Sequence, residues 1–137
     1  MRLEDLEVYS IAMELGKRCW EIVIKWNQFE KSTVGSQWVR AIDSVAANIS
    51  EGWGRYGFKD SRNFLFIARG SLYEAKTWLV KSQQRNLILQ EEYDRTIMVY
   101  ERLGVKLNNY INSHNQQIQQ KNKNNENQQI TTNYAEG

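Results

Sequence analysis

Residues 38–52, WVRAIDSVAANISEG, and residues 61–79, SRNFLFIARGSLYEAKTWL, carry apolar side chains at intervals of three and four. This spacing places them on one face of an α-helix, because a helix has 3.6 residues per turn. The apolar positions are Trp38, Ile42, Val45 and Ile49 in the first segment and Leu65, Ala68, Leu72, Ala75 and Leu79 in the second. The glycines Gly52, Gly54 and Gly57 separate the two segments. The sequence therefore predicts two amphipathic helices joined by a glycine-rich turn.

The same period occurs on both sides of this pair. The upstream stripe consists of Val8, Ile11, Leu15, Cys19, Ile22, Trp26 and Phe29, and the downstream stripe of Tyr93, Ile97, Tyr100, Leu103, Leu107 and Ile111. Ser32 or Thr33 is expected to cap the second helix, and Asp60 or Ser61 the third. Because short connections force neighbouring helices to be antiparallel, residues 1–113 are predicted to form an all-α, up-down-up-down four-helix bundle.

The remaining segment, residues 114–137, has a different composition. It consists largely of Asn, Gln and Lys, and between Asn115 and Gln129 only Ile118 is apolar. A polar segment of this kind buries too little apolar surface to offset its ordering entropy. We therefore expect a disordered, low-complexity tail.

Composition places the chain among small intracellular domains. Its 137 residues suit one domain, and 41% of them are hydrophobic. Proline is absent, which favours long helices. A single cysteine, Cys19, cannot form an intramolecular disulfide, the N-terminus carries acids where a secretory signal is apolar, and no apolar run approaches the ~20 residues that span a bilayer. A cytoplasmic protein without a membrane segment is expected.

No combination of residues predicts catalysis. The single histidine, His114, lies in the tail, whereas Cys19 lies on a core stripe, so a Cys and His pair and a zinc ligand set are both ruled out. The glycines of residues 52–57 follow no strand and precede no Gly-Lys-Ser or Gly-Lys-Thr, unlike a phosphate-binding loop. Glu51 and Glu74 are the only candidate acids, and pairing with Arg40 or Arg69 is the favoured interpretation for them. We expect no enzymatic activity, no metal and no cofactor.

Positive charge is concentrated in the middle of the chain. Residues 38–85 contain eight Lys or Arg, including Lys59, and only four Asp or Glu. Residues 1–30, by contrast, contain six acidic and four basic residues. Arg62, Arg69 and Lys76 are spaced by seven, so they lie on one side of a helix with Tyr73 between them, over about 20 Å. Such residues attract phosphates and stack on unpaired bases. The alternative, a merely solvated helix face, stays open from spacing alone.

Three segments resemble one known family. These are residues 40–55, RAIDSVAANISEGWGR, residues 64–74, FLFIARGSLYE, and residues 3–9, LEDLEVY. They resemble the four-helix-bundle proteins encoded in intervening sequences of 23S ribosomal RNA, a family that includes the accessory variability determinant of diversity-generating retroelements. The chain departs from the usual pattern in lacking the prolines that commonly follow the first helix and interrupt the second.

The resemblance implies a homopentamer with a basic surface that binds nucleic acid and, in the retroelement members, a reverse transcriptase. It implies two residue sets: Arg40, Arg55, Arg62, Arg69 and Lys76 as contacts to phosphate or partner, and Asn48, Glu51, Gly52, Gly70 and Ser71 as structural residues of the helix contacts and the turn.

Two hypotheses follow. The first is a non-enzymatic, homo-oligomeric accessory protein that binds RNA or DNA, in one version beside a retroelement reverse transcriptase, through Arg40, Arg55, Lys59, Arg62, Arg69, Tyr73 and Lys76. The second is a structural or protein-interaction oligomer without nucleic-acid binding. Exposed aromatic residues outside the predicted core stripes, Tyr9, Trp20, Trp53 and Tyr56, favour self-association in either case.

Overall fold

The computed structural model describes the backbone of residues 1–136 and the side chains of residues 1–134. The long helices in this part of the chain are α1 (Glu7–Val23), α3 (Ser36–Trp53), α4 (Phe58–Gln84) and α5 (Gln90–Glu136). One turn of 3-10 helix precedes α1, and the short α2 (Gln28–Glu30) continues through a π-helical turn into α3. No strand occurs among residues 1–136. The prediction of an all-helical fold is confirmed.

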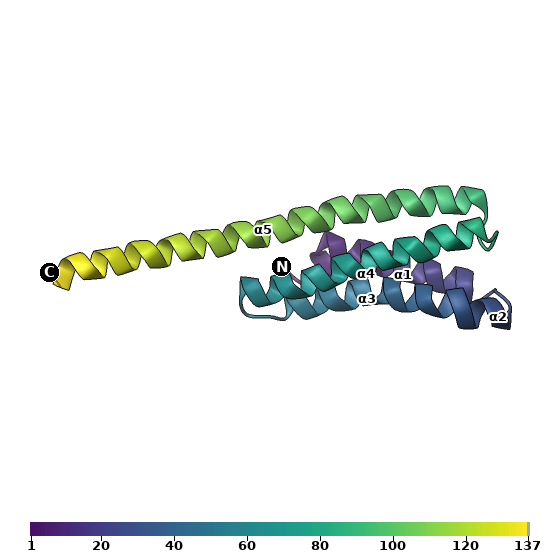
Figure 1. Cartoon of the computed structure of the whole chain (residues 1–137), viewed down its shortest axis with the longest axis horizontal. Helices are drawn as coiled ribbons and strands as arrows, with labels where there is room; N and C mark the ends of the chain where they lie inside the picture. The colour runs from purple at the N-terminus through teal and green to yellow at the C-terminus, as the bar shows by residue number, and fades with distance from the viewer. Residues whose placement is uncertain (137) are drawn as a thin grey trace.

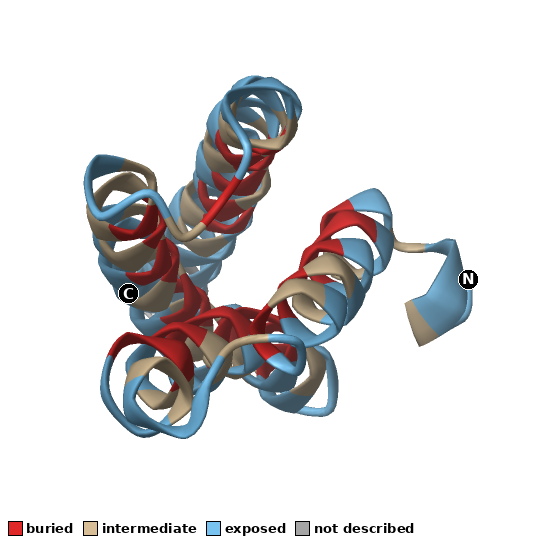
Figure 2. Ribbon diagram, turned by 90° about the vertical axis from the view of Figure 1, so that its right-hand side faces the viewer, coloured by how far each residue is buried: buried red, intermediate tan, exposed pale blue. Residues whose placement is uncertain are grey.

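The chain reverses direction between successive long helices (Figure 1). The most extensive contact is between α3 and α4, while α1 packs on α3 and α5 packs on α4. The contact between α1 and α5 is smaller, and an ion pair between Lys106 Nζ and Glu7 Oε1, 3.0 Å apart, spans it. Seen from the end, the buried residues of the helices face the interior (Figure 2).

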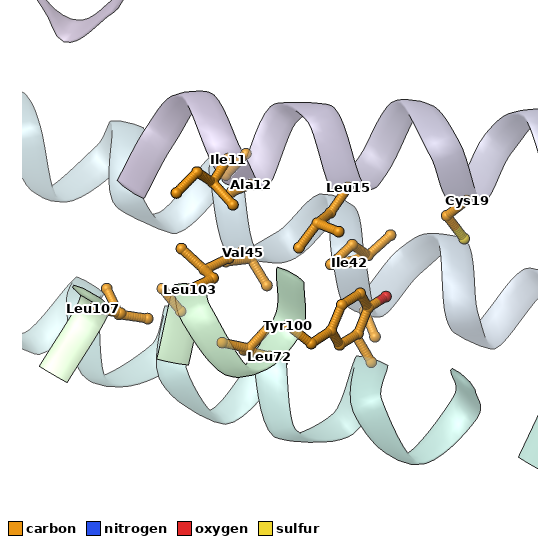
Figure 3. Close-up of a cluster of buried hydrophobic side chains, with 14 of the residues drawn as sticks. Ile11, Ala12, Leu15, Cys19, Ile42, Val45, Leu72, Tyr100, Leu103 and Leu107 are labelled. Carbon is orange, nitrogen blue, oxygen red and sulfur yellow. The ribbon is translucent and has the colours of Figure 1, made fainter. Parts of the chain in front are cut away.

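One apolar core runs through the bundle. Figure 3 shows Leu15 of α1, Ile42 and Val45 of α3, Leu72 of α4 and Leu103 of α5 pointing toward one another. Most of the predicted stripe positions are buried, because each stripe lies on the side of its helix that faces the others. The buried stripe residues are Val8, Ile11, Leu15, Cys19, Trp38, Ile42, Val45, Ile49, Leu65, Ala68, Leu72, Ala75, Leu79, Tyr100, Leu103, Leu107 and Ile111.

Two tryptophans anchor the core with their indole N–H groups. Trp38 is fully buried, and its Nε1 donates to the hydroxyl oxygen of Tyr100 at 2.9 Å, which ties α3 to α5. Trp26 stacks on Trp38 with ring centroids 6.0 Å apart, and its Nε1 donates to the carbonyl oxygen of Leu87 at 3.0 Å. Burial raises the pKa of the Tyr100 hydroxyl, so this group stays protonated and uncharged in the core.

The connection between α1 and α3 differs from the prediction. Helix α1 ends at Val23, and Phe29, predicted as a core residue, lies in α2 with 75% of its surface exposed. Asn27 caps α2 in a reciprocal capping box with Glu30, whereas the hydroxyls of Ser32 and Thr33 donate back to the carbonyl oxygen of Phe29. The turn was not predicted because the apolar residues Trp26 and Phe29 continue the helical spacing of α1 beyond its end.

The turn between α3 and α4 brings two backbones close together. A methyl group at Gly52 would lie 3.0 Å from the carbonyl oxygen of Ser61 and 3.3 Å from Cβ of Phe64, so only glycine fits without a shift. Helix α4 begins at Phe58 without a side-chain cap, earlier than the Asp60 or Ser61 expected. Ser61 is buried, so its hydroxyl serves a tertiary contact.

The predicted disordered tail is not what the structure shows. Helix α5 continues to Glu136, and its C-terminal part projects beyond the bundle (Figure 1). Packing also passes the boundary expected at Ser113, because His114 is buried. Asn, the most frequent residue of the segment from Val105 to Ala135, is a poor helix former, but Gln and Lys are good ones and the segment has neither Gly nor Pro. A helix already anchored in the bundle can therefore extend without paying a new nucleation cost.

Tyr100→Phe tests the buried hydrogen bond. Removal of the hydroxyl leaves the Trp38 N–H unpaired in the core, which costs about 1–3 kcal/mol of unfolding free energy. Urea unfolding measures this loss. Tyr73→Phe is the matched control, because Tyr73 is 64% exposed, and it should leave stability within ~0.5 kcal/mol of the parent. Equal stability of the two variants would contradict the anchoring role of Tyr100.

Candidate functional site

A row of basic residues follows one side of α4. Arg62, Arg69 and Lys76, here called the basic row, are spaced by seven and are each half-buried. Phe66 and Tyr73 lie between them at intervals of three and four, so all five side chains share one stripe of the helix. Because α5 packs on α4, this stripe has the second helix along its flank.

Each member of the basic row has a partner on α5 at the same spacing of seven, in reverse order. Arg62 Nη1 donates to Oδ1 of Asn115 at 2.8 Å, and Arg69 Nη1 donates to Oδ1 of Asn108 at 3.2 Å. Lys76 Nζ forms an ion pair with Oε1 of Glu101. The antiparallel run of α4 and α5 produces this matched seam.

The residues of α5 that contact the basic row determine which of its positive charges are compensated by a negative charge. Asn108 and Asn115 are neutral amides, so they orient two guanidinium groups without neutralising them, whereas Glu101 compensates Lys76. The Nε of Arg62 is buried with no hydrogen-bond partner among the described residues. The row therefore carries two uncompensated positive charges, fixed in place.

Aromatic rings are interleaved with these charges. The guanidinium carbons of Arg62 and Arg69 lie 5.4 Å and 5.1 Å from the centroid of the Phe66 ring, one on each side along the helix. Phe66 is 38% exposed and Tyr73 is 64% exposed. The stripe thus presents rings and cations together, which is the composition of surfaces that bind single-stranded nucleic acid.

The other predicted contact residues lie elsewhere. Arg55, at the α3–α4 turn, pairs with Oε1 of Glu51 at 2.6 Å and lies 3.7 Å from a carboxylate oxygen of Asp60. Lys59 is exposed in the first turn of α4, and Arg40 is exposed on α3. The structure therefore unites Arg62, Arg69, Tyr73 and Lys76 in one stripe and leaves the other three outside it.

The residues predicted as structural do two different things. Asn48 Nδ2 donates to the carbonyl oxygen of Ser44 at 2.8 Å, and the hydroxyls of Ser44 and Ser71 are 2.9 Å apart across the α3–α4 contact. Gly70 differs, since a methyl group there would meet nothing within 4 Å. Close packing within this chain does not explain the glycine at position 70.

The α5 side of the seam was not predicted from the sequence. Glu101, Asn108 and Asn115 repeat every seven residues, as the basic row does, but polar residues of that kind also occur on any solvated helix face. The spacing of these three residues indicates a contact with the basic row only once α4 is known to run antiparallel to α5.

The acids and the cysteine that were considered for catalysis or metal binding have these positions in the described structure. Glu51 is paired with Arg55, and Glu74 accepts from Trp78 Nε1 at 3.5 Å, so neither has the Arg40 or Arg69 partner that was expected. Cys19 is buried, and desolvation together with the charge of Asp43 raises the pKa of its thiol. Among the side chains described, those of residues 1–134, no group of three or more His, Cys, Asp or Glu could hold a metal ion. None of the helices in the described part of the chain has the length and apolar composition that a membrane span needs.

Comparison with known proteins identifies a family. The family model described as 23S rRNA-intervening sequence protein matches residues 4–109. The chain is also similar to a crystal structure at 1.70 Å resolution from Bacteroides thetaiotaomicron VPI-5482, described as a protein with unknown function from the S23 ribosomal protein family. That match has a TM-score of 0.69 and 21% sequence identity, and it covers 81% of this chain and 99% of the other. No curated protein matches the chain.

Two alanine substitutions separate the roles of the glycines. Gly52→Ala should destabilise the protein by about 1–3 kcal/mol, because the new methyl group presses on the backbone of α4. Gly70→Ala should stabilise an isolated subunit by about 1 kcal/mol, because glycine in an open helix interior is unfavourable. Urea unfolding at low protein concentration measures both. A stabilising Gly52→Ala would contradict the close approach of α3 and α4.

Proposed function

The chain belongs to the 23S rRNA-intervening sequence protein family, and from this premise we propose that it is a non-enzymatic, homo-oligomeric accessory protein that binds RNA or DNA. The observation that carries the proposal is the pairing of the basic row with neutral amides. Arg62 and Arg69 are held by Asn115 and Asn108, so their charge remains available to an anion.

Phosphate is the anion that best fits this row. The guanidinium groups of Arg62 and Arg69, which have no carboxylate partner, are seven residues or about 10 Å apart along the helix, and this spacing suits two phosphates of one chain and not a single ion. Each phosphate that they neutralise releases condensed counterions, which favours binding at low salt. Because asparagine holds each guanidinium in one orientation, less side-chain entropy is lost when a phosphate binds.

The rings suit a single strand. Phe66 and Tyr73 are exposed between the cations, and unpaired bases stack on aromatic rings in a sequence-tolerant way. A duplex keeps its bases inside, so it would contact the cations alone. The proposal accordingly assigns the stripe to single-stranded segments or loops of RNA or DNA.

Self-association is assigned to a different helix. Met13 and Trp20 of α1 and Ile24, the residue that follows this helix, each expose about half of their surface. A row of large apolar groups in water is unfavourable, and such rows commonly mark subunit contacts. We place the interface of the homo-oligomer, a pentamer according to the resemblance, on this face of α1. The basic row on α4 is then left open to nucleic acid.

A reverse transcriptase partner is the finer version of the proposal. It rests on the resemblance to the accessory variability determinant of diversity-generating retroelements. A reverse transcriptase gene beside the gene for this chain would support it, whereas placement within a ribosomal RNA gene would favour the other branch of the family.

A second candidate function has one observation in its favour. The basic row also joins α4 to α5, so its cations have a structural role without any ligand. A structural or protein-interaction oligomer that binds no nucleic acid would need nothing more. The test must therefore remove charge while keeping the seam intact.

Replacement of the two amides by carboxylates does this. In Asn108→Asp/Asn115→Asp, each new carboxylate should neutralise its arginine and strengthen the hydrogen bond. Affinity for a labelled single strand should fall, and the slope of log K against log salt should shrink by about 1 for each arginine. Fluorescence anisotropy over a salt series measures both quantities, and urea unfolding should show unimpaired stability.

The control for this variant carries the same charge change elsewhere on α5. Asn109→Asp/Gln116→Glu has the same seven-residue spacing at exposed positions. It should lose clearly less affinity. An equal loss in both variants would mean that net charge, and not the basic row, governs binding; absence of binding by the parent protein would favour the structural oligomer.

Trp20→Lys tests the subunit interface. A charge in the centre of the apolar face should dissociate the particle to the 16.2 kDa monomer without unfolding it, because Trp20 is 57% exposed within the subunit. Light scattering measures the mass. Leu89→Lys, a similar change at a residue 76% exposed near the start of α5, should leave the assembly intact. An assembled Trp20→Lys variant would remove α1 from the interface.

A further inference from the structure

An aromatic hollow lies where the α3–α4 turn meets α5. Its volume is about 360 Å³, within the range of small-ligand sites. Trp53, Tyr56 and Phe58 of the turn line it on one side, and Tyr110 and His114 of α5 on the other. This turn hollow is at the end of the bundle from which α5 projects (Figure 1).

The floor of the turn hollow is rigid. His114 is buried, with Nε2 3.0 Å from the hydroxyl of Ser61 and Nδ1 2.9 Å from the carbonyl oxygen of Tyr110. Its ring meets the rings of Phe58 and Tyr110 edge to face, at centroid distances of 5.6 Å and 4.7 Å. Both ring nitrogens are satisfied, so the histidine holds the aromatic rings in place.

The rim of the turn hollow is made of exposed rings. Tyr56 is fully exposed, Phe58 is 45% exposed and Trp53 is 36% exposed. These three aromatic residues lie within six positions of a surface turn, where water would favour polar residues. Packing within the subunit therefore does not account for Tyr56, and a ligand with a flat apolar face would.

A second hollow of about 250 Å³ adjoins the first and shares Gly57 and Phe58 with it. Lys59 of α4 and Lys121 of α5 line this one, together with Asn122 and Asn125. Neither lysine forms an ion pair with a described side chain. No carboxylate is among the described residues that line the two hollows, and the third cation of the lining, Arg55, is already paired with Glu51.

Gly57 lies at the boundary that the two hollows share. Its φ of −101° is accessible to every residue, and a methyl group there would meet nothing within 4 Å. Neither backbone conformation nor packing requires glycine at this position. A larger side chain would protrude at the boundary that the two hollows share.

We propose that the turn hollow receives one unpaired nucleobase of single-stranded RNA or DNA, while Lys59 and Lys121 hold the adjoining phosphates. The inference rests on the proposed function, because it names the part of the nucleic acid that this end of the bundle binds. The base stacks against the exposed rings of the rim, and the polar groups at its edge reach the side chains of Ser113 and Gln117, which also line the hollow. A paired base cannot enter, so the site prefers single strands.

The test compares three labelled ligands of equal length: a single strand, an abasic single strand with the same phosphates, and a duplex. The parent protein should prefer the base-bearing strand to the abasic strand, by about tenfold for a base in the turn hollow and further for bases stacked on Phe66 and Tyr73. Tyr56→Ala should reduce this preference by about tenfold, and Tyr56→Phe, which retains the ring, should keep it in full. Because Tyr56 is fully exposed, neither change should disturb the fold.

Two further variants assign the parts of the site. Lys59→Gln/Lys121→Gln should weaken the base-bearing and abasic strands by the same factor, because it removes phosphate contacts alone. Asn108→Asp/Asn115→Asp, at the basic row, should also weaken both and keep the part of the preference that Tyr56 provides.

The outcomes separate this inference from the proposed function. If no ligand binds, both fail. If Tyr56→Ala keeps the full preference, the proposed function stands and the turn hollow is not a base site. If the abasic strand binds as tightly as the base-bearing strand, neither the turn hollow nor the rings of the basic row bind a base, and only the phosphate contacts of the row remain. If Tyr56→Ala lowers the particle mass and leaves affinity unchanged, the ring serves a protein contact, which overturns the inference.

Discussion

The indole of Trp38 requires a hydrogen-bond acceptor in the middle of an apolar core, and Tyr100 provides it. Because an unpaired N–H in that position would cost about 1–3 kcal/mol, α3 and α5 are held in one register along the bundle axis. Helix α4 packs against both, with Gly52 allowing the backbones of α3 and α4 to meet. The position of α5 along α4, and with it every polar contact of their seam, depends on this arrangement.

The seam shows how a structural contact can leave charge available. Had aspartate stood at positions 108 and 115, the same geometry would have produced two ion pairs and an electrically neutral surface. Asparagine instead satisfies the guanidinium N–H groups of Arg69 and Arg62 and retains their charge. At the third position, Glu101 does neutralise Lys76, so the basic row is most positive toward the α3–α4 turn.

That turn is where the proposed activities converge. The basic row begins at Arg62, one helical turn after the exposed Phe58, and Phe58 and His114, whose rings are in contact, both line the turn hollow. The polar continuation of α5 forms one wall of the adjoining hollow through Ile118 and Lys121. A segment that composition alone predicts to be a solvated tail therefore lines a hollow, because it stays helical after leaving the bundle.

Local spacing by itself determined the helical class, four long helices and nearly the whole core, because the period of an α-helix is a property of neighbouring residues and Leu65 to Leu79 display it directly. It also identified Arg62, Arg69, Tyr73 and Lys76 as one stripe. It could not place the α1–α3 turn, where Asn27 and Glu30 form a cap inside a continuing apolar period. Only the tertiary structure decided which cations have no carboxylate partner, that His114 is buried, and that Trp53, Tyr56 and Phe58 line one side of a hollow. These properties depend on contacts between residues about 50 positions apart, such as Arg62 with Asn115 and Ser61 with His114, and no local pattern specifies the partner across that distance.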